Sequence, residues 1–133
     1  GKDDPLTWKD MALLTVLSLG ALLENLADRQ LRHFRRKKKK SREEKFSVLS
    51  TGLWKYSRHP NYLGEMIFWW ALFLLGYSHH APIWCALGPL LITLMMIFGS
   101  IPMSEDRMYR KYPDYKFVIQ RVPMLFPTFS SSR

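Results

Sequence analysis

The longest apolar stretch in the chain runs from Met66 to Ser104 without a single Lys, Arg, Asp or Glu. A stretch of this length is too apolar for the surface of an ordinary soluble protein. Residues 76–82 interrupt it with Gly-Tyr-Ser-His-His-Ala-Pro, a sequence that favours a turn. The pattern predicts a transmembrane helical hairpin over about residues 60–103.

A second apolar stretch precedes the hairpin at about residues 7–27. Apolar residues dominate it up to Leu23, and Glu24 and Asp28 follow, so it has the length of a membrane span with a polar end. Together with the hairpin it predicts an all-α fold, an integral membrane helical bundle of about three transmembrane helices. We expect residues 1–133 to form a single membrane domain.

The net charge of +9 at pH 7 resides almost wholly in one segment. Residues 29–45 hold ten Lys or Arg against Glu43 and Glu44, which gives +8 (ten minus two). A basic loop directly after a membrane span marks the inner side of the membrane, so topology is its first interpretation. Binding of anionic lipid headgroups is the second, and a nucleic-acid role, for which no motif is present, is the third. We expect membrane lipids and not nucleic acid as partners, with these candidate headgroup residues: Arg35, Arg36, Lys37, Lys38, Lys39 and Lys40.

This topology places both ends of the hairpin on the side of the basic loop. The turn at His79 and His80 then lies on the opposite side. Two adjacent histidines without further ligands nearby do not make a metal site, and none is predicted. The start of the hairpin and the tail after it, residues 105–133, share one membrane face, where their polar groups are expected to meet.

The first polar cluster begins the hairpin at residues 52–65, which read Gly-Leu-Trp-Lys-Tyr-Ser-Arg-His-Pro-Asn-Tyr-Leu-Gly-Glu. Pro60 suits the first turn of a helix, and the free N–H groups of such a helix end favour an anion. Arg58 and His59 stand just before this end, where they would suit a phosphate.

Three more polar residues follow inside the predicted helix. Asn61 and Glu65 lie one turn apart on one face, with Tyr62 beside them. A carboxylate one turn into a membrane is costly unless it is paired or faces a polar cavity, and Arg58 is its expected partner. The alternative interpretation is a structural salt bridge among interfacial Tyr and Trp anchors.

The second polar cluster follows the hairpin and consists of Glu105, Arg107, Tyr109, Arg110, Tyr112, Tyr115 and Lys116. Pro113 is expected to break the helix after Tyr112. Residues 121–127 contain two prolines, which oppose a helix, so we expect them to be extended. The tail is therefore predicted to be amphipathic and to lie on the membrane face.

The motif at residues 52–65 closely resembles the signature of the steroid 5α-reductase-like membrane proteins, in the branch of predicted steroid reductases. The resemblance covers about residues 23–127. Outside the motif it rests on Glu24, Asp28, Gln30, Trp69, Trp70, Glu105, Tyr112, Tyr115 and the segment at Pro127.

The wider superfamily carries two chemistries on one scaffold, so the fold alone does not decide the function. Sterol and steroid reductases use NADPH, whereas isoprenylcysteine and phospholipid methyltransferases use S-adenosylmethionine. Both share an Arg-His-Pro-x-Tyr core. Asn61 and the pair Gly64 and Glu65 are more similar to the sterol-reductase form. The resemblance therefore implies a membrane oxidoreductase that uses NADPH to reduce a double bond of a steroid-like or other lipid substrate.

The resemblance also implies roles for individual residues. Tyr62 and Glu65 are the candidate catalytic residues, because protonation after hydride transfer needs an acid such as a tyrosine. The residues implied to bind the cofactor are Arg58, His59, Asn61, Tyr62, Glu65, Glu105, Tyr112, Tyr115 and Lys116.

Relatives in this family have several helices before the region that this chain matches, and those helices supply the substrate pocket. We therefore expect the chain to be the C-terminal part of a larger fold. One alternative is a non-catalytic structural or lipid-binding subunit of a membrane complex, with bound phospholipid and no cofactor. The other is an S-adenosylmethionine-dependent lipid or isoprenylcysteine methyltransferase. The endoplasmic reticulum fits the family, and the mitochondrial inner membrane fits the charges equally.

Overall fold

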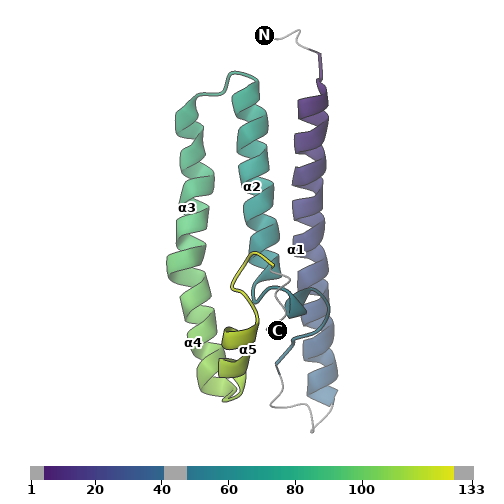
Figure 1. Ribbon diagram of the computed structural model, residues 1–133, viewed down its shortest axis with the longest axis vertical. Coiled ribbons are helices and arrows are strands. Elements are labelled where there is room, and N and C mark those ends of the chain that lie inside the picture. The colour runs from purple at the N-terminus through teal and green to yellow at the C-terminus, as the bar shows by residue number, and fades with distance from the viewer. Residues whose placement is uncertain (1–4, 41–47, 128–133) are drawn as a thin grey trace.

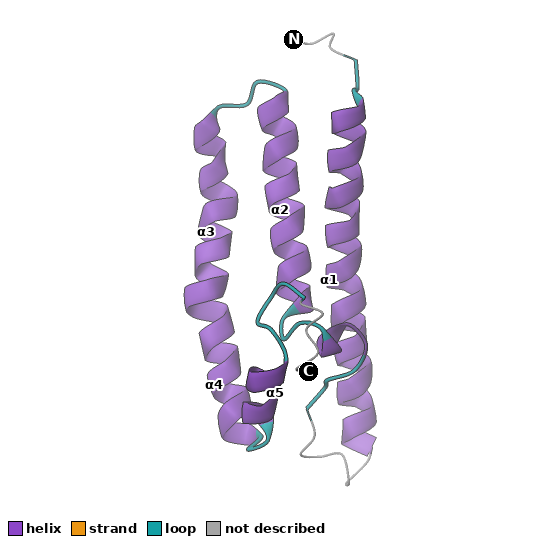
Figure 2. Ribbon diagram, viewed as in Figure 1, coloured by secondary structure: helices purple, strands orange, loops and turns teal. Residues whose placement is uncertain are grey.

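The computed structural model describes residues 5–40 and 48–127, and these contain helices and connecting loops but no strand (Figure 2). The five α-helices are α1 (Trp8–Lys40), α2 (Pro60–Ser78), α3 (Leu87–Met95), α4 (Ile101–Lys111) and α5 (Tyr115–Arg121). Short 3₁₀ turns, Gly52–Lys55 and Ile83–Ala86, precede α2 and α3, and a π-helical turn, Met96–Ser100, joins α3 to α4. The expectations for Ser41–Lys45 and for the last residues of the tail lie outside the described residues.

Three long rods lie side by side: α1, α2, and the continuous rod of α3 and α4 (Figure 1). The predicted hairpin is present, because α2 ends at Ser78 and a turn leads to α3. At the other end of the rods α5 folds back against α4, and the segment after α5 runs to the start of α2 (Figure 1). The chain therefore gathers its two predicted polar clusters at one end of the rods.

Two helical stretches, Trp8–Lys39 and Ile83–Lys111, are long and apolar enough to cross a membrane by length and composition. The helix between them, α2, begins with the polar residues Asn61 and Glu65 and is not among these candidates. The described residues thus support membrane association through two helices.

The first helix runs further than the hydropathy pattern predicts. The first does not end near residue 27 but continues to Lys40, so the described part of the predicted basic loop, from Arg29, is helical. Residues 28–40 contain neither Gly nor Pro and are rich in Lys and Arg, which are good helix formers. The third rod ends at Lys111, in agreement with the helix break expected at Pro113, and the π-helical turn directly before α4 accommodates the missing N–H of Pro102.

A small core joins the rods at the end that carries the polar clusters. It consists of Leu63, Met66, Met96, Ile101 and Leu125. These side chains come from α2, the π-helical turn, α4 and the segment after α5. The same packing that holds the rods together therefore anchors the tail near the start of α2.

The opposite end is tied by polar contacts around Asp10. The backbone N–H of Thr7 donates to the Asp10 carboxylate at 3.0 Å, and the Asp10 N–H lies 3.4 Å from the Thr7 hydroxyl, which is a reciprocal cap on α1. His79 Nε2, in the turn after α2, lies 2.9 Å from the other Asp10 oxygen. The turn is thereby fixed to the start of α1.

The backbones of α1 and α2 touch at two glycines. A Cβ atom built on Gly64 would lie 2.6 Å from both the carbonyl oxygen of Gly20 and the amide nitrogen of Glu24. Real Cβ atoms do not approach backbone atoms so closely. Small residues at such a crossing let two helices pack with their backbones in contact. The position of α2 against α1 thus depends on the absence of a side chain at residue 64.

We expect Gly64→Ala to destabilise the fold, because the two helices must separate to admit the new methyl group. Overpacking of this kind costs about 1–3 kcal/mol. Thermal unfolding in detergent, followed by circular dichroism, measures the loss. The matched control is Gly76→Ala in the same helix, whose Cβ would meet only the Ala81 Cβ at 3.6 Å and should leave the midpoint unchanged or raised. Equal midpoints for the two variants would contradict the close contact.

Candidate functional site

The start of α2 positions the first polar cluster. Pro60 is the first helical residue, and the carbonyl oxygen of His59 accepts a hydrogen bond from the N–H of Leu63 at 3.0 Å. The Ser57 hydroxyl accepts from the His59 N–H at 3.2 Å, which bends the chain just before the helix. Arg58 and His59 therefore stand at a fixed place at the end of α2.

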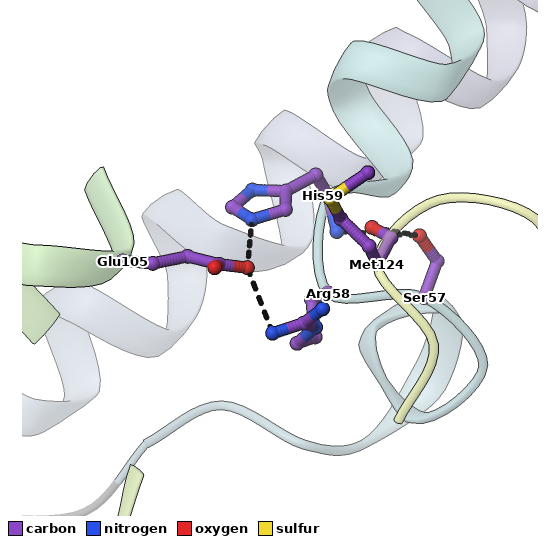
Figure 3. A network of polar contacts seen from close by, with 5 residues as sticks. All are labelled: Ser57, Arg58, His59, Glu105 and Met124. Carbon is purple, nitrogen blue, oxygen red and sulfur yellow. Dashed lines mark hydrogen bonds and ion pairs between the residues drawn. The ribbon is translucent and has the colours of Figure 1, made fainter. Parts of the chain in front are cut away.

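One oxygen of Glu105 joins both of these residues to α4 (Figure 3). Arg58 Nη1 and His59 Nε2 each lie 2.9 Å from Glu105 Oε1. The side chains are mostly buried, at 11% exposed for Arg58 and 19% for Glu105. The two polar clusters meet here, as the topology predicts.

The ion pair of Arg58 corrects one expectation. From the sequence, Arg58 is expected to pair with Glu65, whereas in the structure it pairs with Glu105. The physical reason is that α4 packs beside the start of α2 and brings Glu105 within 2.9 Å of Arg58, a pairing that has no local sequence signal. Glu65 instead lies on α2 close enough to Glu24 of α1 for their charges to interact.

His59 is a neutral imidazole with a defined tautomer. Burial lowers its pKa below the usual value near 6.5, and the hydrogen bond to Glu105 offsets only part of this effect. Because a carboxylate accepts but does not donate, the contact requires the proton to be on Nε2. The ring stacks on Tyr62 with the centroids 5.4 Å apart. Glu105 thus orients the imidazole, and the imidazole orients Tyr62.

The segment after α5 closes over the motif. The N–H of Arg58 donates to the carbonyl oxygen of Pro123 at 2.9 Å, and the Ser57 hydroxyl lies 3.5 Å from the carbonyl oxygen of Met124 (Figure 3). Val122 is extended, whereas Arg121 ends α5 and residues 124–126 form bends, so the expected extended segment over residues 121–127 is present only in part. The tail therefore binds the motif through backbone atoms, a contact that side-chain patterns do not reveal.

The tyrosines of the tail have different environments. Tyr115 is buried, and burial together with the nearby Glu105 charge raises its pKa to about 12, so it stays protonated. Burial alone would raise the pKa of Tyr112, but the hydrogen bond and charge of Lys38 outweigh it and lower that pKa. Lys38 Nζ also lies 3.7 Å from the centre of the Tyr112 ring. Tyr115 belongs to the Glu105 cluster, whereas Tyr112 belongs to the end of α1.

The remaining predicted cofactor residues divide between the site and the surface. The Asn61 Nδ2 amide donates to Asp28 Oδ1 of α1 at 3.2 Å. Lys116 is exposed and extends over the ring of Phe117, 5.2 Å from its centre, and no described contact joins it to Glu105. Asp28 is a site residue for which the only sequence signal is the resemblance.

Two buried polar atoms at the motif lack a hydrogen-bond partner among the described residues. They are Arg58 Nε, a donor, and Asn61 Oδ1, an acceptor. Unpaired buried polar groups are costly, so such atoms mark a place where a ligand can bind. A phosphate oxygen would satisfy the guanidinium, and an amide N–H₂ would satisfy the asparagine. No group of three or more His, Cys, Asp or Glu side chains in the described part of the chain is arranged to hold a metal ion.

The sequence is similar to one described protein family and to a yeast protein. Residues 1–122 match the model of a family described as a protein of unknown function, DUF1295. The chain is 30% identical over 140 residues to an uncharacterized protein of Schizosaccharomyces pombe. The alignment covers 92% of this chain and 40% of the yeast protein, so the chain spans well under half the length of that relative. No solved structure matches.

We expect the free energy of unfolding to fall as the pH drops below about 6.5. The folded His59 binds its proton only at lower pH than the unfolded histidine does, because its pKa is lowered. The unfolded state therefore takes up more protons in this window, and acid favours it. Denaturation at pH 7.5 and 5.5 in wild type and in His59→Gln measures the effect. Glutamine at this position should reduce the difference in the free energy of unfolding between the two pH values. The same difference in both proteins would contradict the account.

Proposed function

The chain belongs to the DUF1295 family, and we propose that it forms the cofactor-binding part of an integral membrane oxidoreductase. This enzyme would use NADPH to reduce a double bond in a steroid or another lipid. The observation that carries the proposal is the buried Arg58, which pairs with Glu105 through one nitrogen and leaves its Nε donor without a partner. The resemblance of residues 52–65 to the steroid 5α-reductase-like proteins supplies the chemistry.

Three membrane spans are proposed for the chain. Two helices have the length and composition of a span, and α2 lies between them in the hairpin. Large apolar side chains are exposed on α3 and the π-helical turn, where lipid would cover them: Leu87, Leu91, Leu94, Met95 and Phe98. The motif would then lie at the membrane surface, and a lipid substrate would enter sideways from the bilayer.

The cofactor would be held by complementary donors and acceptors. NADPH supplies a hydride when it is bound. Arg58 Nε would donate to a phosphate oxygen, while Glu105 keeps the guanidinium in place. Asn61 Oδ1 would accept from an amide group, while Asp28 holds its Nδ2. Both side chains are fixed before any ligand binds, which lowers the entropy cost of binding.

Tyrosine hydroxyls are the proposed source of the proton. Tyr62 is held by the ring of His59, which Glu105 orients in turn. Tyr115 keeps its proton at neutral pH because its pKa is raised to about 12. We assign Tyr62 as the acid, with Glu65 beside it on α2, and Tyr115 as a hydrogen-bond donor within the cofactor site.

We expect the native-length protein in lipid nanodiscs to bind NADPH saturably, and Arg58→Lys to weaken that binding about 10- to 100-fold. Lysine keeps the positive charge beside Glu105 but has no Nε donor and no fork, so the fold should persist. Isothermal titration calorimetry measures the affinity. The matched control is Arg110→Lys on α4, where the arginine is exposed and pairs with Asp106 at 3.3 Å, and it should not change the affinity.

Three other outcomes of these binding measurements would contradict the proposal. Unchanged NADPH binding in Arg58→Lys would remove Arg58 from the site. Saturable binding of S-adenosylmethionine instead of NADPH would favour methyl transfer. Co-purified phospholipid with neither cofactor bound would favour the non-catalytic subunit.

A further inference from the structure

The end of α1 extends beyond the thickness of a membrane. Its 33 residues measure about 50 Å at 1.5 Å per residue, whereas the hydrocarbon core takes about 20 residues. Counted from Trp8, the span ends close to Asp28. The helical residues from Arg29 onward, which we call the α1 arm, therefore exceed the length of the proposed span. They lie at the end of the rods that carries the motif (Figure 1).

Contacts with the rest of the protein define an inner face of the α1 arm. The carbonyl oxygen of Ala27 accepts from Trp54 Nε1 at 3.1 Å, and Gln30 Oε1 accepts from the Leu53 N–H at 3.1 Å. Further along, Lys38 lies against Tyr112. These contacts hold the arm against the motif loop and the end of α4, so its orientation is fixed.

The outer face of the α1 arm is a row of cations. Arg29, Arg32, Arg36 and Lys39 are exposed and lie on one side of the helix, opposite Ala27, Leu31 and Lys38. Between residues 29 and 39 the chain holds no acidic residue that would neutralise them. The helix thus presents a basic ridge, made of these four residues, that no carboxylate of the arm screens.

We propose that the part of this basic ridge nearest the membrane, Arg29 and Arg32, binds the headgroups of anionic phospholipids in the leaflet that surrounds the motif end. The inference rests on the proposed membrane placement but not on the cofactor. The headgroup layer is about 5–8 Å thick on each side, and surface charge is screened over about 8 Å at physiological salt. Arg29 and Arg32 lie within that layer, whereas Lys37 and Lys39 lie about 12–15 Å further along the helix than Arg29.

This difference in depth gives a charge-matched test. The double variants Arg29→Gln/Arg32→Gln and Lys37→Gln/Lys39→Gln each remove two positive charges. The native-length protein is reconstituted in phosphatidylcholine bilayers with spin-labelled phosphatidylserine or phosphatidylcholine, and electron spin resonance measures the lipid held at the protein. We expect wild type to prefer phosphatidylserine. In the arginine variant, the preference for phosphatidylserine should fall at least about fivefold. In the lysine variant, it should fall much less.

Two results would overturn the proposal. One is equal retention of the two lipids by wild type. The other is an equal loss of preference in both double variants, which would indicate a diffuse effect of net charge. NADPH affinity, measured on the same samples, should be unchanged, because no described contact joins Arg29 or Arg32 to Arg58 or Asn61. If only NADPH affinity falls in the arginine variant, the ridge belongs to the cofactor site.

Discussion

The site depends on the contacts that the Glu105 carboxylate makes with Arg58 and His59. A mostly buried carboxylate is tolerated only when it is paired and hydrogen-bonded, and Arg58 and His59 satisfy it from the start of α2. Arg58 in turn binds the tail through its backbone N–H, and Tyr115 lies near enough for the Glu105 charge to raise its pKa. One charged group thus connects α2, α4 and the tail, and it fixes the tautomer of the imidazole on which Tyr62 stacks.

The contact between α1 and α2 sets the other half of the site. Because Gly64 and Gly20 bring the two backbones together, Asn61 reaches Asp28 and Glu65 comes near Glu24. This contact also changes how the motif is interpreted. Gly64 is required by helix packing, so its presence in the signature reports on the fold and not on the chemistry. The resemblance to the reductase form of the motif therefore rests on Asn61 and Glu65.

Local sequence predicted the helical hairpin, its turn and the helix break at Pro113. The extended segment expected over residues 121–127 is present only in part, because α5 continues to Arg121 and residues 124–126 bend. The meeting of the two polar clusters followed from topology. The length of α1 was missed, since charged residues that end a hydrophobic pattern do not end a helix. The partners of Arg58 and Lys38 were also missed, because a pairing across 47 or 74 residues (105 minus 58, 112 minus 38) has no local signal.

The central claim is that Arg58 and Asn61 bind a phosphate-bearing cofactor through atoms that are otherwise unpaired. The most direct measurement is the nuclear magnetic resonance signal of the Arg58 Nε–H group, in native-length protein labelled with ¹⁵N-arginine and identified by its loss in Arg58→Lys. We predict that NADPH shifts this signal downfield in a saturable manner, as expected when the donor gains an acceptor. A signal that stays in place at saturating NADPH, or that responds only to S-adenosylmethionine, would contradict the account.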